Sequence, residues 1–283
     1  MKKVLFILIM FLFPVFFIQA AKPIVKTTPK PVVPIKILLV PGHDNEVWGA
    51  QYGNIKEADM NLVLATQIYN LLKKDKRFKV YITRNSLGYS KEFASYLSLH
   101  EAEIVSFRDN AKKEMKKKVS SGAFVNNVVV VHNSVAKNTS IQLYGINKWA
   151  NENKMDAVIH IHFNDIPRSS VWKIGDYKGF SIYMPDGQFS NSLKSAKLAG
   201  NVFAQLSKKY KTSTLPEEEG GLIPDQKLIA LGSSNTLLSN VRSILVEYGY
   251  VYEKIFRNSS TRRQAYKTMA DMTVKGIKNN FFP

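Results

Sequence analysis

Short apolar runs alternate with one long amphipathic segment in the first third of the chain, and this alternation constrains the fold more than any other feature. Residues 36–40 (KILLV) form an apolar run that ends at Pro-Gly, and residues 78–83 (FKVYIT) form another. Between them, residues 57–74 place apolar side chains mostly three or four positions apart, which predicts a helix with one apolar face. A strand, a helix and a strand within this length predict a right-handed βαβ unit and a parallel sheet.

The remainder of the chain largely continues this pattern. Strands are predicted at residues 157–162, 179–184, 227–231 and 243–247, and helices at residues 192–209 and 262–280. We therefore expect the α/β class, with a single domain whose twisted, mostly parallel sheet is flanked by helices. Residues 85–143 do not fit the pattern. We expect them to form an insertion between the second and third core strands, with a charged helix-like run at 101–118 and an apolar run at 127–131.

The N-terminus has the layout of a secretory signal peptide over residues 1–21. A short basic region precedes an apolar run, and two alanines follow it. A retained membrane anchor is the alternative, but the apolar run is short for a membrane span, which needs about 20 residues. Residues 22–35 contain four prolines, which favour an extended linker. The folded domain is therefore expected to span residues 36–283.

The charge and cysteine content narrow the classes of function. The chain carries 40 Lys and Arg against 22 Asp and Glu, a net charge of +18 at pH 7, and it has no Cys. The absence of Cys excludes a disulfide scaffold and a thiol nucleophile. The charge indicates either a solvated lysine-rich surface or affinity for nucleic acid, an anionic membrane or an anionic wall polymer. Because export separates the chain from nucleic acid, we expect no nucleic-acid partner.

Three side chains of metal-binding type lie where an open parallel sheet binds its ligands, at the C-terminal ends of strands. His43 follows the first strand in Pro-Gly-His, His162 ends another strand, and Glu57 opens the first helix. Two imidazoles and one carboxylate, with a fourth position for water, are a set typical of catalytic zinc. Zinc in such a site lowers the pKa of the water and polarises a carbonyl group.

Glu247 closes the apolar strand predicted at 243–247, where burial would raise its pKa toward the range of a general acid–base. Each residue also has a simpler explanation. A histidine after a strand is often a hydrogen-bonded loop residue, Glu57 is a favourable acid in a first helical turn, and Glu247 could pair with a lysine. Two other histidines compete for the metal. His132 follows an apolar run, and His160 shares a strand face with His162.

These residues belong to an ordered set of motifs that resembles the zinc-dependent N-acetylmuramoyl-L-alanine amidases of the amidase-3 type, a family of cell-wall hydrolases. The matching motifs are Pro41-Gly42-His43, Gly49-Ala50, Glu57-x-x-x-Asn61, Thr83-Arg84, Ile161-His162-Phe163-Asn164, Gly179-x-x-x-Tyr183 and Val246-Glu247-Tyr248-Gly249-Tyr250. Their order and spacing agree with the family from residue 37 to residue 281, apart from the insertion.

The resemblance implies a Zn²⁺ ion held by His43, Glu57 and His162, with Glu247 as the catalytic glutamate. It implies hydrolysis of the amide between N-acetylmuramic acid and L-alanine of the peptidoglycan stem peptide. Peptidoglycan is then the partner. The net positive charge separately favours an anionic wall polymer as a further partner through the basic surface, and the sequence identifies no regulatory protein partner. The implied location is the periplasm or cell wall of a bacterium.

Departures from the family pattern concern substrate handling more than metal binding. Asp44-Asn45 replaces the usual Gly-Gly after His43 and could present Asp44 near the metal, and Leu231-Gly232 replaces the usual Leu-Arg. The helix before the third strand lacks its usual Arg at 144–150.

Two questions follow from the sequence. The insertion at 85–143 is interpreted as a lid, as a docking surface through its Lys-rich run at 112–118, or as a disordered segment. Two other functions compete with the amidase: a zinc peptidase or deacylase on another secreted substrate, and a non-catalytic cell-wall-binding protein on the same fold. The four intact site positions argue against the last.

Overall fold

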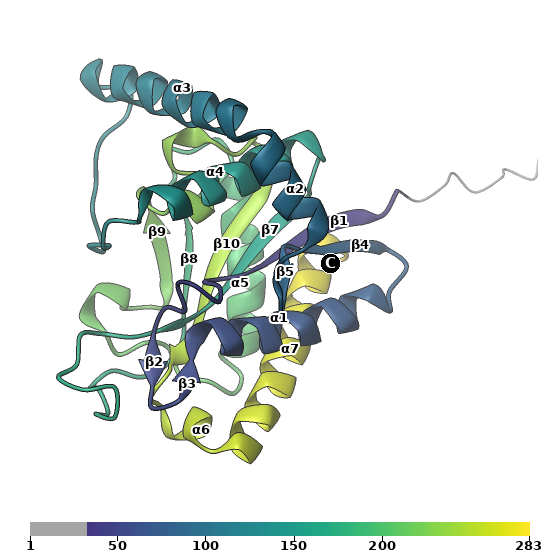
Figure 1. The fold of residues 1–283 in the computed structure, drawn as a ribbon, viewed down its shortest axis with the longest axis vertical. Coiled ribbons are helices and arrows are strands. Elements are labelled where there is room, and N and C mark those ends of the chain that lie inside the picture. Colours follow the sequence, from purple (N-terminus) through teal and green to yellow (C-terminus); the bar gives the residue numbers. More distant parts are fainter. Residues whose placement is uncertain (1–32) are drawn as a thin grey trace, which may run out of the picture. The chain divides into compact units, whose positions relative to one another are not determined.

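The computed structural model describes residues 33–283 (Figure 1). The predicted signal peptide and nearly all of the predicted linker lie outside the described residues. The first strand begins at Ile35, the residue at which the predicted linker ends. Within residues 33–283, no helix combines the length and apolar character that a membrane crossing requires.

A six-stranded sheet forms the centre of the domain, in the order β4-β1-β7-β10-β8-β9. The strands are β1 (Ile35–Pro41), β4 (Phe78–Ile82), β7 (Ala157–Asn164), β8 (Ser181–Pro185), β9 (Leu222–Asp225) and β10 (Arg242–Tyr250). All neighbouring pairs are parallel except β8 and β10, which are antiparallel. The predicted α/β class with a mostly parallel sheet is confirmed.

Helices cover both faces of this sheet (Figure 1). On one face, α1 (Glu57–Lys73), α5 (Ser192–Leu206) and α7 (Ser259–Phe281) bury the larger apolar core. On the other face, α4 (Lys137–Glu152) and α2 (Lys91–Leu99) pack on a second core, and α3 (Glu101–Ser120) packs against α4. Successive side chains of β1 point to opposite faces of the sheet. Ile37 and Leu39 therefore enter the first core, and Leu38 and Val40 enter the second.

Short elements complete the domain. Two small hairpins pair β2 (Gln51–Tyr52) with β3 (Ile55–Lys56), and β5 (Arg84–Asn85) with β6 (Gly88–Tyr89). The remaining elements are the short helix α6 (Lys254–Arg257) and the 3₁₀ turns η1 (Pro216–Glu218), η2 (Ile229–Leu231) and η3 (Ser233–Asn235).

The strand predicted at 227–231 is wrong, because β9 lies at Leu222–Asp225 and residues 229–231 form the turn η2. The Asp225 side chain explains the difference: its Oδ1 accepts hydrogen bonds from the backbone N–H groups of Lys227 and Leu228, which turns the chain away from the strand.

The predicted insertion is structured over most of its length. It contains β6, α2 and α3, and its last residues, 137–143, form the start of α4. The apolar run at 127–131 forms no strand, and it leaves Val128, Val129 and Val131 exposed.

Candidate metal centre

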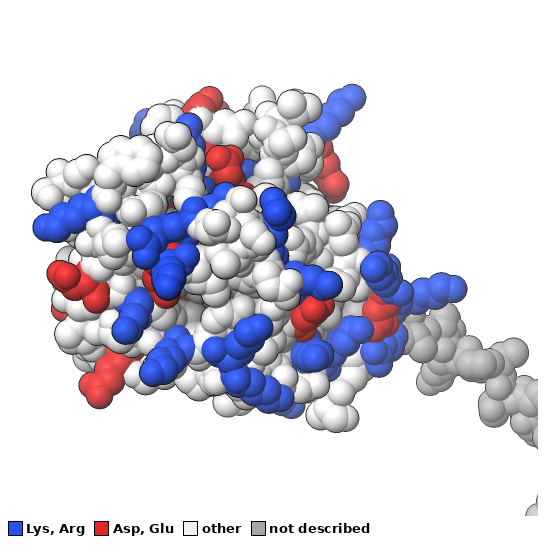
Figure 2. Space-filling model, turned by 90° about the horizontal axis from the view of Figure 1, so that it is seen from below, with Lys and Arg blue, Asp and Glu red and all other residues white. Residues whose placement is uncertain are grey.

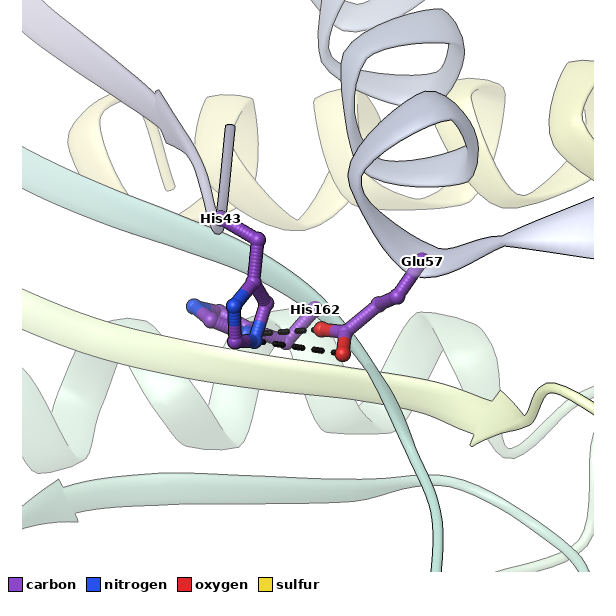
Figure 3. A group of neighbouring side chains, drawn as sticks. All are labelled: His43, Glu57 and His162. Carbon is purple, nitrogen blue, oxygen red and sulfur yellow. Dashed lines mark hydrogen bonds and ion pairs between the residues drawn. The ribbon is translucent and has the colours of Figure 1, made fainter. Parts of the chain in front are cut away.

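The structure brings His43, Glu57 and His162 together at the C-terminal edge of the sheet (Figure 3). His43 Nε2 lies 3.2 Å from Glu57 Oε2, and His162 Nδ1 lies 2.9 Å from Glu57 Oε1. One ligand atom from each residue lies within 4.8 Å of the others. The predicted set of three therefore converges on one point, from a loop, a helix start and a strand end.

Backbone geometry after β1 aims His43 at this point. Gly42 N–H donates to the carbonyl of Ile161 on neighbouring β7, which holds the end of β1 to that strand. His43 itself has φ of 59°, a left-handed conformation that is uncommon and strained for a residue with a Cβ. A Cβ on Gly42 would lie 2.1 Å from the His162 ring, so glycine is required for the close approach of the two histidines.

Glu57 is the most firmly held of the three. Its carboxylate accepts hydrogen bonds from the backbone N–H groups of Ala50 and Phe163 and from the Asn61 side chain, at 2.9, 3.2 and 3.2 Å. Asn61 follows four residues later on α1, so it lies on the same helical face. A Cβ on Gly49, whose φ is +72°, would lie 2.3 Å from Glu57 Oε2, which explains a glycine at this position.

A buried arginine holds the loop that carries His43. Arg84, which follows β4, donates to the carbonyl oxygens of Pro41, Gly42 and Ala58 at 2.7–3.1 Å. Asn61 donates a second hydrogen bond to the Gly42 carbonyl at 2.9 Å. These bonds connect the end of β1 with the first turn of α1, and they fix the separation of His43 and Glu57.

The electrostatics of the group favour a carboxylate between two imidazoles. Burial pushes the pKa of Glu57 upward, but hydrogen bonds with His162 and His43 outweigh burial and hold that pKa far below its usual range. Burial lowers the pKa of His162, and the neighbouring His43 adds to this effect. Burial lowers the pKa of His43, but the hydrogen bond and charge of Glu57, together with the Val47 backbone and the charge of Asp44, outweigh burial and raise it.

Glu247 lies beside this group as a cross-strand neighbour. In the β7–β10 register, Glu247 is paired with His162, so the two side chains share one face of the sheet. Among residues 33–283, no donor lies within hydrogen-bonding distance of Glu247 Oε2. Burial and the negative charges of Glu57 and Glu218 raise the pKa of Glu247 well above its usual value. The carboxyl group is thus suited to carry a proton.

The competing residues lie elsewhere. His160 is buried in the sheet, where burial lowers its pKa to about 3, and it is not part of the converging group. His132 Nε2 lies 2.7 Å from Asp225 Oδ2, so this histidine is engaged by a different carboxylate. Asp44 Oδ1 accepts from the N–H groups of Glu46 and Val47 and closes a turn instead of joining the three.

Zinc fits the residues that converge here. Two histidines and one carboxylate are the protein donors typical of a catalytic zinc site with three protein ligands. The Glu57 carboxylate is charged, its orientation is fixed by N–H donors, and both imidazoles present a ring nitrogen to it. Supporting groups of this kind orient ligands in metalloproteins.

The sequence model of one protein family, the amidase-3 N-acetylmuramoyl-L-alanine amidases, matches residues 37–279 of the chain. The chain belongs to this family. Membership makes it a hydrolase that acts on an amide, and it places all four predicted site residues within the matched region. Among curated protein sequences, none matches the chain.

Solved structures of amidases share the fold at low sequence identity. The CwlD amidase from Clostridioides difficile, in complex with the GerS lipoprotein, is 16% identical with a TM-score of 0.55, covering 87% of this chain and 98% of that one. The amidase Ami1 from Mycobacterium smegmatis is 15% identical with a TM-score of 0.55, covering 88% and 97%. The amidase AmiC2 of Nostoc punctiforme is 18% identical with a TM-score of 0.53, covering 88% and 98%.

Several residues of this candidate site were not assigned a role from the sequence. Asn61 and Arg84 belong to the motifs of the resemblance, and their positions in those motifs were the available signal. Glu218 had no such signal. It is fully buried and accepts hydrogen bonds from Tyr183 Oη at 2.6 Å and Asn164 Nδ2 at 2.9 Å, beside Glu247.

Proposed function

We propose that this chain is a secreted, zinc-dependent N-acetylmuramoyl-L-alanine amidase that acts on peptidoglycan in the periplasm or cell wall of a bacterium. The observation that carries the proposal is the convergence of His43, Glu57 and His162 beside Glu247, in a member of the amidase family. The proposal includes a signal peptide at 1–21, a linker at 22–35 and a catalytic domain at 36–283 with the insertion at about 85–143.

His43, Glu57 and His162 would hold the Zn²⁺ ion in this proposal. When bound, zinc supplies Lewis acidity, which polarises the carbonyl of the substrate and lowers the pKa of a water molecule. The hydrogen bonds from Ala50 and Phe163 to Glu57 keep its carboxylate oriented, so the chain presents its donors in a fixed arrangement.

Glu247 would transfer the proton in this reaction. Its carboxylate accepts a proton from the attacking water as the oxygen bonds to the amide carbon, and it then gives that proton to the departing nitrogen. The carbon–nitrogen bond breaks, the lactyl group of N-acetylmuramic acid keeps the new oxygen as a carboxylate, and L-alanine leaves with a free amine. The raised pKa of Glu247 supports this role, because the group must both accept and release a proton.

Digestion of purified sacculi tests the proposal. The full-length secreted protein loaded with Zn²⁺ should release glycan with lactyl carboxylates and peptides that begin with a free L-alanine amine. A chelator should stop the release, and added Zn²⁺ should restore it. Cleavage within the peptide cross-bridge without these products would favour a zinc peptidase instead. Tight sacculus binding with no cleavage and no bound zinc would favour a non-catalytic wall-binding protein.

An anionic wall polymer is proposed as a further partner of the basic surface. Figure 2 shows the face that includes α6, on which Lys and Arg outnumber Asp and Glu. Lys254 and Arg257 of α6 are exposed. Clustered positive charge attracts polyanions over a range that salt shortens. Retention of the protein on sacculi should therefore fall as NaCl is raised, even when the Glu247→Ala variant is used and no substrate is cleaved.

A further inference from the structure

The connection between α3 and α4 runs along the β9 side of the sheet (Figure 1), and it contacts Asp225 at the end of β9 and the next residue, Gln226. We call residues 125–133 of this connection the strap. Near its start, two glutamine side chains hold its backbone. Gln188 bonds both N–H and C=O of Val125, at 2.8 and 3.0 Å, and Gln226 bonds Asn127 N–H and the Val125 carbonyl at the same two distances.

Further along, a buried carboxylate and an apolar contact hold the strap. Asp225 Oδ2 lies 2.7 Å from His132 Nε2, while its Oδ1 accepts two backbone N–H groups. Asp225 is only 4% exposed, so this pair is largely removed from solvent on the Asp225 side. Val130 packs on the small apolar cluster that contains Tyr183 and Leu245. The strap is therefore attached at both of its ends.

This attachment makes the strap one wall of the cavity that contains Glu247. The cavity measures about 400 Å³, and the strap contributes residues 130–133 to its lining. Glu247, Glu218, Tyr183 and Leu245 also line this cavity, and the Tyr183 ring packs edge-on against His132 of the strap. Pockets of this volume are in the range that holds small ligands.

A second cavity of about 430 Å³ adjoins the first. It is lined by Trp48, Gly49 and Arg168, and it shares Asn133 and residues 165–167 with the first cavity. Gly49 is the residue packed against His43 and Glu57, so this second cavity adjoins the metal centre. The cleft thus has two lobes that meet at the end of the strap.

The chemistry of amide cleavage assigns a different part of the substrate to each lobe. The proton donor must lie on the side of the departing nitrogen, and in the proposed function that nitrogen belongs to L-alanine of the stem peptide. The lobe lined by Glu247 therefore faces the peptide, and the lobe beside Trp48 and Gly49 faces the muramyl group.

From these contacts we infer that the strap is the peptide-selecting wall of this enzyme. Residues 130–133 contact the stem peptide beyond its first alanine, and the His132–Asp225 pair holds them in place. The inference rests on the proposed function, because the assignment of the lobes depends on which nitrogen leaves. It gives the insertion a role in substrate specificity, through a wall that is already closed in the structure.

Two soluble substrates test the inference: N-acetylmuramoyl-L-alanine, and the same muramyl group carrying a stem tripeptide. The readout is the ratio of kcat/KM for the tripeptide substrate to kcat/KM for the one-residue substrate. His132→Ala and Asp225→Asn should each lower this ratio about tenfold, mainly through KM, which corresponds to about 1.4 kcal/mol of lost binding. Val131→Ala, at an 89% exposed position that lines the cavity, should lower it less and should not affect folding.

His100→Ala is the matched control. It removes a histidine of the same insertion that also pairs with a carboxylate, Glu103, and that does not line the cavity. It should leave the ratio unchanged. An unchanged ratio in His132→Ala, Asp225→Asn and Val131→Ala alike would overturn the inference. Faster cleavage of both substrates in these variants would also overturn it, because the strap would then obstruct the cleft instead of binding the peptide.

Binding of the free stem tripeptide, measured by calorimetry on the zinc-loaded protein, separates this inference from the proposed function. If no muramyl amide is cleaved but the strap variants weaken tripeptide binding, the proposed function fails, and the role of the strap in binding the peptide is supported. If the amide is cleaved, and the strap variants change neither tripeptide binding nor the ratio of kcat/KM values, the role of the strap is contradicted and the proposed function is supported.

Discussion

The metal centre and the strap lie on the same cleft, yet they are held in place by different kinds of contact. Glu57 and His43 are fixed by backbone N–H donors, by Arg84 and by glycines that leave no room for a Cβ. The strap has no regular secondary structure, and it is held by the side chains of Gln188, Gln226 and Asp225.

This difference distinguishes the residues proposed to carry out the reaction from those proposed to select the peptide. Contacts made by the backbone and by glycines change little with sequence, so they preserve the arrangement of donors that the reaction requires. Contacts made by a few long side chains are easily exchanged, and loops held this way are where binding specificity commonly varies. We therefore expect substitutions at the metal centre to abolish the reaction, and substitutions in the strap to change which peptide is cleaved.

The largest expected effect is the loss of a ligand. His162→Ala should lower zinc affinity by more than about 100-fold, the upper end of the 10–100-fold cost of losing a group that merely supports a ligand. Activity on sacculi should disappear with the metal. His132→Ala should bind zinc as the wild type does, and metal analysis after dialysis measures both. Zinc loss in His132→Ala and not in His162→Ala would mean that the wrong histidine has been assigned to the metal.

The next effect separates proton transfer from metal binding. Glu247→Gln should reduce kcat by about 10²–10⁴-fold, the usual contribution of general acid–base catalysis, with zinc content unchanged. Single-turnover rates and metal content are measured on the same sample. A variant that loses both zinc and activity would show that Glu247 helps to hold the metal.

A smaller effect is expected from the glycines. Gly49→Ala should destabilise the protein by about 1–3 kcal/mol, because its φ of +72° strains an alanine and the new Cβ would clash with Glu57. Gly200→Ala is the control, since nothing lies within 4 Å of its Cβ position and it lies inside α5, where alanine is favoured. Urea unfolding gives both free energies, and equal effects would contradict the role assigned to Gly49.

The smallest effect concerns the stability that the Asp225 contact with the strap contributes at low pH. Burial raises the pKa of Asp225, but hydrogen bonds from His132 and from the backbone N–H groups of Leu228 and Lys227 outweigh burial and lower it below 3.8. A lowered pKa contributes stability that is present above pH 3.8 and is lost as the pH falls through the lowered value. Thermal melts below pH 3.8 should therefore show a steeper loss of stability in the wild type than in Asp225→Asn. Identical slopes would mean that the pKa of Asp225 is not lowered in the folded protein.

The fold was predictable because its signals are local. Apolar periodicity located β1, α1 and β4, and chain order then placed the strand ends at one edge of the sheet. The error at 227–231 arose where an apolar run was turned by the side chain of Asp225, a contact that periodicity does not show.

The candidate site was only partly predictable. His43, Glu57, His162 and Glu247 were named from strand ends, a helix start and the family motifs. The structure brings the first three together and pairs Glu247 with His162 across neighbouring strands. The strap was not foreseen, because its contacts join residues far apart in the chain: His132 and Asp225 are 93 positions apart. Pairs so far apart in the chain leave no periodic pattern in the sequence from which they could be predicted. Glu218 was missed for the same reason, since Asn164 and Tyr183, which donate to it, lie 54 and 35 positions away.

The pairing of Glu247 with His162 in the β7–β10 register has a consequence for engineering. A slip of one residue would exchange Glu247 for Val246 or Tyr248 and turn the carboxyl group to the opposite face of the sheet. The alignment of these two backbones therefore sets the distance between the proposed proton carrier and the proposed metal ligand. A designer who wishes to move this reaction to another scaffold should transplant β7 and β10 together as one aligned pair.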